Sequence, residues 1–251
     1  MKRIQLNPKY EHLRAFVEYM AEAMDTEGTY IYGGKRNLIK MFEASDGTQL
    51  NIKRYKKPNI ASNLVYSYGL RVPKGQRAYD YSFRLLELGI ETPEAVAYIE
   101  ERNSLGLLQH TWFVSIQLPY THLLYEVGNA AEGTYEELAV AIGAMAADMH
   151  EKQVLHRDFS PGNILWDYDN EGYHFAVVDI NRMRFGTVSM EDGCKSFARL
   201  WGPRRFIELI VRSYATRRRL DETQCLCIAM GERTRFWTRY QKKHEVQFNL
   251  E

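Results

Sequence analysis

The stretch HRDFSPGNILW, from His156 to Trp166, carries the densest chemical signal in this chain. Its polar first half contains Asp158, and Asn163 follows five positions later, directly before a short apolar run. A second apolar run, FAVVD, ends in a carboxylate at Asp179, sixteen positions after Asn163. Short apolar runs bounded by turn residues are consistent with buried strands. The pattern therefore predicts a polar loop anchored by a strand, with a second carboxylate at the end of another strand.

The order H-R-D, four residues, then Asn is the catalytic-loop signature of protein-kinase-like phosphotransferases. In such a loop Asp158 is expected to take the proton of the acceptor hydroxyl, as the catalytic base. Asn163 is expected to reach a magnesium ion on the nucleotide phosphates, and Asp179, in the place of the D-F-G aspartate, to be the second magnesium ligand. Ile180 and Asn181 replace the Phe and Gly of that motif, so a switch driven by the Phe is not expected.

Three strands are predicted upstream, at 29–32, 38–43 and 49–55, with Asp46-Gly47 as the hairpin turn between the last two. Such a meander is typical of the start of a kinase N-lobe. Its first turn contains Gly33, Gly34 and Lys35, but not the G-x-G-x-x-G pattern that covers phosphates in protein kinases. Two interpretations stay open. The glycines let the backbone approach the nucleotide phosphates while Lys35 adds charge, or the segment is a simple hairpin turn.

Lys53 lies on the third of these strands, at the position of the kinase lysine that pairs the α- and β-phosphates. The basic neighbours Arg54, Lys56 and Lys57 could be mistaken for this phosphate-binding lysine. Alternation along a strand puts Lys53 and Tyr55 on one face and Arg54 on the other, and the register of the motif selects Lys53.

The acid that pairs with Lys53 is the weakest part of the expected constellation. A helix is predicted over 77–88, ending at Gly89, where a kinase carries a Glu for this purpose. Asp80 is the best-placed acid on it, and Glu87 is a rival two turns later.

The rest of the chain fits a two-lobed arrangement, with a predicted N-lobe at 1–118 that binds the nucleotide. The predicted C-lobe at 119–251 holds the catalytic loop, the metal site and the acceptor site. Leu118-Pro119-Tyr120 is the expected hinge, and a Thr134/Glu137 capping box is expected to start the helix that leads into the catalytic loop. Further elements predicted from periodicity are helices at 10–24, 194–214 and 226–242 and a hairpin of 95–100 with 107–117.

Composition narrows the class of protein. The 251 residues carry a formal net charge of +1, so no general affinity for nucleic acid is expected. Three cysteines fit neither a disulfide framework nor a four-ligand zinc site. No apolar run approaches the ~20 residues needed to span a bilayer, and no signal-peptide core is present. An intracellular, cytoplasmic location is expected. The apolar residues between Lys57 and Lys74 either pack locally or touch a lipid surface.

HRDFSPGNILW together with VVDINRMRFG at Val177–Gly186 resembles the lipopolysaccharide kinase (Kdo/WaaP) family. The similarity extends more weakly to IKRYKKPN at Ile52, to the helix around RAYDYSFRLLELGIETPEAVAYIE and to CKSFARLWG at Cys194. The resemblance implies an α+β, two-lobed protein-kinase-like fold, with an antiparallel sheet plus helix in the N-lobe and a mainly helical C-lobe.

The resemblance also implies a function. Members of this family use ATP and a divalent metal to phosphorylate Kdo or heptose in the lipopolysaccharide inner core, at the cytoplasmic face of the inner membrane. By position, Asp158 is the catalytic base, Asn163 and Asp179 are the metal ligands, and Lys53 binds phosphate. The expected partners are ATP, a sugar or glycolipid acceptor and, peripherally, an anionic membrane surface.

Two other functions fit parts of the pattern. Aminoglycoside- and choline-type phosphotransferases share the chemistry, but they typically carry H-G-D and an acid-rich acceptor lobe. The segment that follows Asp179 is basic here, and Arg217-Arg218-Arg219 is either a solvated face or a contact for an anionic acceptor or lipid. A pseudokinase that acts as a binding module would lack the base or a metal ligand, and all three are present here.

Overall fold

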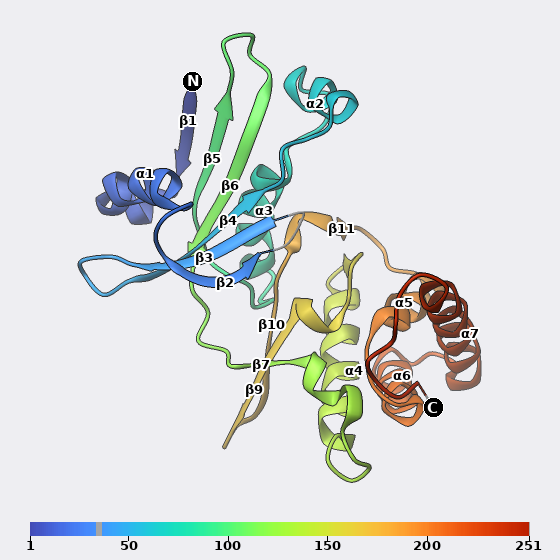
Figure 1. Ribbon diagram of the computed structural model, residues 1–251. Coiled ribbons are helices and arrows are strands. Elements are labelled where there is room, and N and C mark those ends of the chain that lie inside the picture. Colours follow the sequence, from blue (N-terminus) through green and yellow to red (C-terminus); the bar gives the residue numbers. More distant parts are fainter. Residues whose placement is uncertain (34–36, 251) are drawn as a thin grey trace. The chain divides into compact units, whose positions relative to one another are not determined.

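The computed structural model describes residues 1–33 and 37–250, and Gly34 and Lys35 of the predicted glycine turn lie outside them. The chain divides into two compact units (Figure 1). The first comprises Met1–Pro119 with Asp179–Asn181, and the second Tyr120–Val178 with Arg182–Glu251. The assignment of nucleotide binding to the first and acceptor binding to the second stays a prediction.

The first unit is built on a six-stranded antiparallel sheet with the order β1-β5-β6-β4-β3-β2. Its strands are β1 Lys2–Leu6, β2 Thr29–Gly33, β3 Asn37–Glu43, β4 Gln49–Tyr55, β5 Ala95–Arg102 and β6 Leu108–Ile116, and its helices are η1 Pro8–Leu13, α1 Arg14–Ala23, α2 Ile60–Ser67 and α3 Lys74–Glu87. The sequence predicted one helix over 10–24, but the chain kinks at Tyr10, where φ is −112°, so a short 3-10 segment precedes α1.

Helices α1 and α3 cover opposite faces of this sheet. Ile99 and Trp112 belong to the core that α1 closes with Val17 and Met20. Their chain neighbours Tyr98 and Thr111 lie against Gly75 of α3, where an added Cβ would be 3.1–3.2 Å from them. Successive strand residues point to opposite faces, so the two helices are on opposite sides.

Alternation along β4 settles which basic residue faces which side. Ile52 is buried in the core under α1, and Arg54, two positions on, donates to both carboxylate oxygens of Asp25 at 2.6 and 2.8 Å. Lys53 points to the other face, where it forms an ion pair with Asp179. The predicted separation of Lys53 from Arg54 is confirmed.

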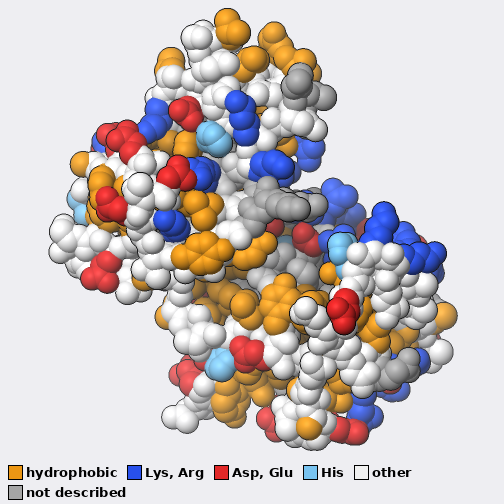
Figure 2. Space-filling view, in the orientation of Figure 1, with side chains coloured by type: hydrophobic (Ala, Val, Ile, Leu, Met, Phe, Trp, Pro, Cys, Tyr) orange, Lys and Arg blue, Asp and Glu red, His pale blue; other side chains and the backbone are white. Residues whose placement is uncertain are grey.

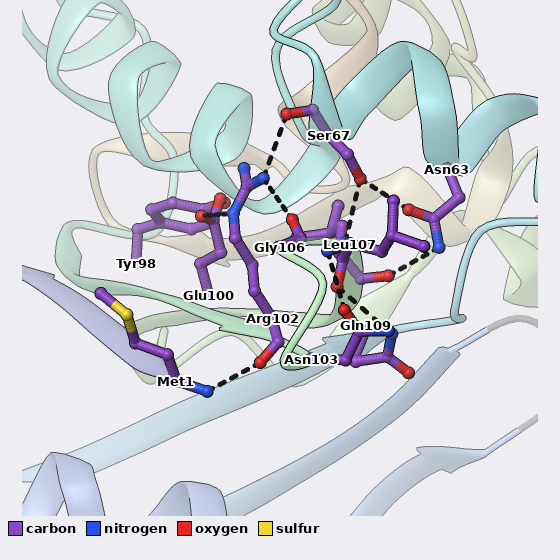
Figure 3. A network of polar contacts seen from close by, with 11 residues as sticks. Met1, Asn63, Ser67, Tyr98, Glu100, Arg102, Asn103, Gly106, Leu107 and Gln109 are labelled. Carbon is purple, nitrogen blue, oxygen red and sulfur yellow. Dashed lines mark hydrogen bonds and ion pairs between the residues drawn. The ribbon is translucent and has the colours of Figure 1, made fainter.

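Arg102 ties α2 and the β5–β6 turn together (Figure 3). Its guanidinium donates to the Glu100 carboxylate at 2.6 Å and to the carbonyls of Ser67 and Gly106 at 3.1 and 2.9 Å. The Ser67 hydroxyl in turn accepts from the Leu108 N–H at 3.0 Å. This polar network holds the end of α2 at one end of the sheet.

The second unit is mainly helical. Its helices are η2 Leu124–Asn129, α4 Glu136–Glu151, η3 Pro161–Asn163, α5 Met190–Ser196, η5 Phe197–Arg199, α6 Arg204–Arg218 and α7 Glu222–Gln241. Its strands are β7 His122–Leu123, β8 Val154–His156, β9 Ile164–Asp169, β10 Gly172–Val177 and β11 Met183–Phe185. The short helix η4 Ile180–Arg182 begins in the first unit and ends at the first residue of the second unit's last segment. Strands β10, β9 and β7 form one small antiparallel sheet, and β11 pairs with β8. Gly143 lets α4 and α6 approach closely, because a Cβ there would be 2.3 Å from the Ile210 carbonyl oxygen.

Two local predictions were wrong in this unit. The helix predicted over 194–214 is interrupted, because Gly202 has φ +127° and Pro203 precedes α6, so α5 and η5 form a separate segment. The predicted Thr134/Glu137 capping box is absent. Glu136 instead accepts from the N–H groups of Gly133 and Tyr135 at 2.8 and 3.1 Å, so α4 starts two residues after Thr134.

His150 is a buried core histidine on α4. Its Nδ1 lies 2.9 Å from the Tyr214 hydroxyl, and burial lowers the pKa of its imidazole to about 3. The unfolded chain binds the proton near pH 6.5. The contribution of His150 to the free energy of unfolding is therefore fully present above pH 6.5. It is lost as the pH falls from 6.5 towards 3, because the unfolded chain then binds a proton that the folded protein does not.

Replacing His150 by Gln is expected to flatten this acid-side loss of stability. The wild type should lose roughly 2 kcal/mol of unfolding free energy from this group between pH 7.5 and pH 5, and His150→Gln should not. Urea unfolding at the two pH values measures the difference. The matched control is His174→Gln, because His174 is more exposed and pairs with Asp169. Equal pH dependence in wild type and His150→Gln would contradict the expectation.

Candidate active site

The loop after β8 is held by its own histidine. The Asp158 N–H donates to His156 Nδ1 at 3.1 Å, and His156 Nε2 lies 2.9 Å from the Val178 carbonyl oxygen. Because Nδ1 accepts from a backbone donor, Nε2 carries the proton and donates to Val178. His156 is almost fully buried. It therefore fixes the backbone of Asp158 and links the loop to the residue that precedes Asp179 in the chain.

Asn163 is oriented by the same loop. Its Nδ2 donates to the Asp158 carbonyl oxygen at 2.9 Å, and its own carbonyl oxygen accepts from the Val178 N–H at 3.0 Å. With the amide nitrogen so engaged, the side-chain oxygen Oδ1 is left as an acceptor. Gly162, just before it, lies against the Tyr125 ring, and a Cβ there would be 2.8 Å from the tyrosine oxygen. The glycine is needed for this close approach.

Two arginines converge on the Asp158 carboxylate. Arg182 Nη1 donates to Oδ2 at 3.1 Å, and Arg199 Nη1 forms a short hydrogen bond with Oδ1. The side chain of Asp158 is 19% exposed, whereas each arginine is 44% exposed. The predicted base is therefore a partly buried carboxylate that is hydrogen-bonded to two partly exposed guanidinium groups.

The first unit contains the predicted lysine and the second predicted acid. Lys53 Nζ pairs with Asp179 Oδ1, and both side chains are largely buried. Asn181 Nδ2 donates to the same oxygen at 2.7 Å. Asp179 has φ +56°, a left-handed conformation that is uncommon outside glycine and costs backbone strain. The chain therefore holds this carboxylate in a defined and strained position.

Buried polar atoms gather next to this pair. The Tyr55 hydroxyl interacts with the Asn181 side chain, and Arg77 Nε has no hydrogen-bond partner among the described residues. Burial, with the Asp179 charge as the next cause, raises the pKa of Tyr55 well above its usual value. Burial likewise lowers the pKa of Arg77. Buried polar groups without partners are costly, so this part of the unit is suited to a polar ligand.

The donor chemistry also fits the expected metal. Asp179 supplies carboxylate oxygens and Asn163 a free amide oxygen, and hard oxygen donors are what Mg²⁺ prefers. Asp179 accepts a hydrogen bond from Asn181, and Asn163 donates one to the Asp158 carbonyl oxygen, so both side chains are held in place.

The predicted partner of Lys53 is not found on α3. Asp80 and Glu87 are both exposed, and Lys53 pairs with Asp179 instead. The prediction of an Asp80–Lys53 ion pair is therefore not met. The physical reason is that the buried side of α3 is formed by other residues, among them Ala78 and Ser82, which turns Asp80 outward.

The glycine turn is described only in part. Gly33 ends β2 and is exposed, and its carbonyl oxygen accepts from the Tyr30 hydroxyl at 3.0 Å. A Cβ on Gly33 would be 2.7 Å from the Tyr30 ring. This close contact is a local reason for the glycine, and a role in binding phosphates stays a prediction.

Arg182 and Arg199 were not identified from the sequence as residues of the site. Both lie in segments that carried the family resemblance, VVDINRMRFG and CKSFARLWG. Their spacing from Asp158, 24 and 41 positions, contains no local signal, and only the fold brings them to the carboxylate.

The fold and the loop together define a protein-kinase-like phosphotransferase. A family model for the lipopolysaccharide kinase (Kdo/WaaP) family matches residues 25–211. Because the match covers more than half of the chain, the protein belongs to this family. The predicted family and enzyme class are confirmed.

Solved structures show the same fold. WaaP in complex with acyl carrier protein matches with a TM-score of 0.62 and 20% identity, covering 97% of this chain and 100% of that one. The Rio2 kinase–ADP/Mg²⁺–phosphoaspartate complex from Chaetomium thermophilum matches with a TM-score of 0.50 and 14% identity, covering 90% and 75%. No curated protein matches the chain. The predicted α+β kinase-like fold is confirmed.

Proposed function

We propose that this kinase transfers the γ-phosphoryl group of ATP to a sugar hydroxyl of the lipopolysaccharide inner core, on Kdo or heptose. Membership of the family supports the class of reaction. The observation that carries the proposal is the loop geometry, in which His156 fixes the backbone of Asp158 and Asn163 turns its amide nitrogen towards the loop.

In the proposed reaction the acceptor hydroxyl oxygen forms a bond to the γ-phosphorus. Its proton passes to the Asp158 carboxylate, and the bond between the γ-phosphorus and the β–γ bridging oxygen breaks, releasing ADP. Asp158 is suited to this role because it is an acceptor fixed by its backbone and partly shielded from water. A positioned base of this kind contributes roughly 10²–10⁴-fold to the rate.

Asn163 and Asp179 are the residues that would hold Mg²⁺. When bound, the ion neutralises charge on the nucleotide phosphates. Lys53 would bind a phosphate oxygen in place of its present partner Asp179. Arg77 Nε, which has no hydrogen-bond partner among the described residues, is a donor of the kind that binds a phosphate group.

The direct test is a phosphate-transfer assay with the purified chain and γ-labelled ATP. The acceptors are Kdo- and heptose-bearing core glycolipids, an aminoglycoside, a choline derivative and a peptide. We expect transfer to a core glycolipid and none to the cationic acceptors, because two arginines lie at the base. Transfer to an aminoglycoside or a peptide alone would overturn the proposal. Nucleotide binding without any turnover would point to a pseudokinase.

We place the protein at the cytoplasmic side of the inner membrane, in peripheral contact with it. Within residues 1–33 and 37–250, no helix is long and apolar enough to cross a membrane. Large apolar side chains are nevertheless exposed on and after α2, with Tyr68 at 75% and Leu70 at 79%, and Arg71 lies beside them in the chain. Figure 2 shows hydrophobic side chains on the surface at this end of the first unit.

Anionic vesicles are expected to bind the protein at low salt and to release it at high salt. Exposed charges are screened over a Debye length of ~8–10 Å at physiological ionic strength, while the apolar side chains add a salt-insensitive part. The doubly substituted variant Tyr68→Ser/Leu70→Ser should bind these vesicles more weakly in a sedimentation assay. The matched control is Tyr168→Ser, at an exposed tyrosine of the second unit. Equal loss in both variants, or no binding at low salt, would count against the membrane contact.

A further inference from the structure

The charges around Asp158 do not balance. Several exposed arginines among the described residues pair with a carboxylate of their own, such as Arg217 with Asp148 and Arg212 with Glu222. Arg182 and Arg199 share the single carboxylate of Asp158. One positive charge is therefore left over beside the proposed base. Figure 2 shows that Lys and Arg side chains also gather over α5 and α7 of the same unit.

Both guanidinium groups have hydrogen-bond donors to spare. An arginine carries five N–H donors, and Arg182 and Arg199 each use only Nη1 on Asp158, with no further hydrogen bond to the described residues. Each side chain is 44% exposed, so these donors are accessible. Guanidinium groups bind carboxylates and phosphates in a paired, planar geometry that a single ammonium group does not provide.

Arg199 is held in place from a second side. Its guanidinium carbon lies 5.4 Å from the centre of the Phe236 ring on α7, a cation–π distance. Arg182 is fixed within η4, directly before β11. Two guanidinium groups that meet at one carboxylate, one of them also held against an aromatic ring, form an anion-binding pair, which we call the arginine pair.

We propose that the arginine pair Arg182 and Arg199 binds an oxyanion group of the acceptor, a carboxylate or a phosphate, and so places the neighbouring hydroxyl at Asp158. The inference rests on the proposed function and adds the basis of acceptor selection. Each guanidinium group would bind Asp158 with one N–H and the acceptor anion with its remaining N–H groups. The two arginine side chains therefore fix the distance between the acceptor anion and the base. Neutral or cationic acceptors leave the extra charge unpaired and are selected against.

Kinetics with matched acceptors test the pair. The acceptors are a Kdo-bearing glycolipid, the same glycolipid with the Kdo carboxyl reduced to an alcohol, and the same glycolipid without its phosphate groups. The variants are Arg182→Gln, Arg199→Gln, Arg199→Lys and the control Arg212→Gln. Removing charge-assisted hydrogen bonds should raise the acceptor KM roughly 10–100-fold in the two Gln variants, with a much smaller change in kcat and in the KM for ATP. Arg199→Lys should retain part of the affinity, and Arg212→Gln should match wild type.

The altered acceptors identify the anion. The wild type should show the same rise in KM with the acceptor that lacks the recognised group, and the Gln variants should lose nothing further with that acceptor, because the interaction is already gone. If kcat falls equally for all acceptors at unchanged KM, the arginines only position Asp158, and the proposal is overturned. A rise in the KM for ATP alone would assign them to the nucleotide and overturn it as well.

A binding measurement keeps the inference separate from the proposed function. If no core glycolipid is phosphorylated by the wild type, the proposed function has failed, and calorimetric titration with free Kdo and with inorganic phosphate then decides on the pair. Binding in wild type and Arg212→Gln that is lost in Arg199→Gln supports it. Equal binding in all three proteins, or binding in none, overturns it.

Discussion

Replacing Asp158 by Asn is expected to lower phosphoryl transfer by roughly 10²–10⁴-fold, the contribution of a positioned general base. The carboxamide keeps the size of the side chain and its backbone hydrogen bonds to His156 and Asn163. It loses the charge and the capacity to take the proton of the acceptor hydroxyl. Nucleotide binding should stay near that of wild type, since Asp158 has no part in the expected nucleotide contacts. Steady-state transfer and nucleotide titration measure the two quantities.

The control is Asp148→Asn, because Asp148 also accepts two hydrogen bonds from an arginine, Arg217, at 2.8 and 3.1 Å. Its side chain is about half exposed, and loss of its ion pair should change the free energy of unfolding by at most about 1 kcal/mol and turnover very little. Melting temperatures of both variants separate catalysis from folding, since Asp158→Asn also leaves the arginine pair without its counter-charge. Turnover close to wild type in a folded Asp158→Asn protein would remove Asp158 from the role of base.

The parts of this fold that follow from local pattern could be predicted. Strand β4 was predicted with its observed bounds. Alternation along it correctly placed Lys53 and Arg54 on opposite faces, because successive side chains of a strand point to opposite sides of the sheet. The loop from His156 to Asn163 was recognised because its residues are close in sequence. The break before α6 had a signal, Gly202-Pro203, that the apolar periodicity across it concealed.

The contacts that depend on tertiary placement could not be predicted. The partner of Lys53 was sought on the following helix, but the observed partner, Asp179, is 126 positions away. The strained φ of Asp179 is likewise absent from the sequence pattern, since Asp is not the residue that usually marks a left-handed position. Arg182 and Arg199 meet at Asp158 only because three separate segments fold together.

Replacing Asp179 by Asn is expected to weaken Mg²⁺-dependent nucleotide binding and to lower turnover by at least roughly 10²-fold, the effect of losing one electrostatic contact to the reacting phosphate. A neutral amide is a poor ligand for a hard cation. Asn is also among the non-glycine residues that best tolerate a left-handed conformation, so the backbone at φ +56° should persist. The loss can therefore be assigned to charge. A magnesium titration with a fluorescent nucleotide measures the binding.

The matched control for Asp179 is Asp25, whose basic partner lies on the opposite face of β4. Asp25 pairs with Arg54 as Asp179 pairs with Lys53, one position away along β4. Asp25→Asn should therefore leave the magnesium dependence of nucleotide binding unchanged, although it also removes a carboxylate from a basic residue of β4. The two variants together separate a general loss of ion pairing in the sheet from loss of a metal ligand. If Asp179→Asn shows the magnesium dependence of wild type, the metal site would have to be sought elsewhere in the chain.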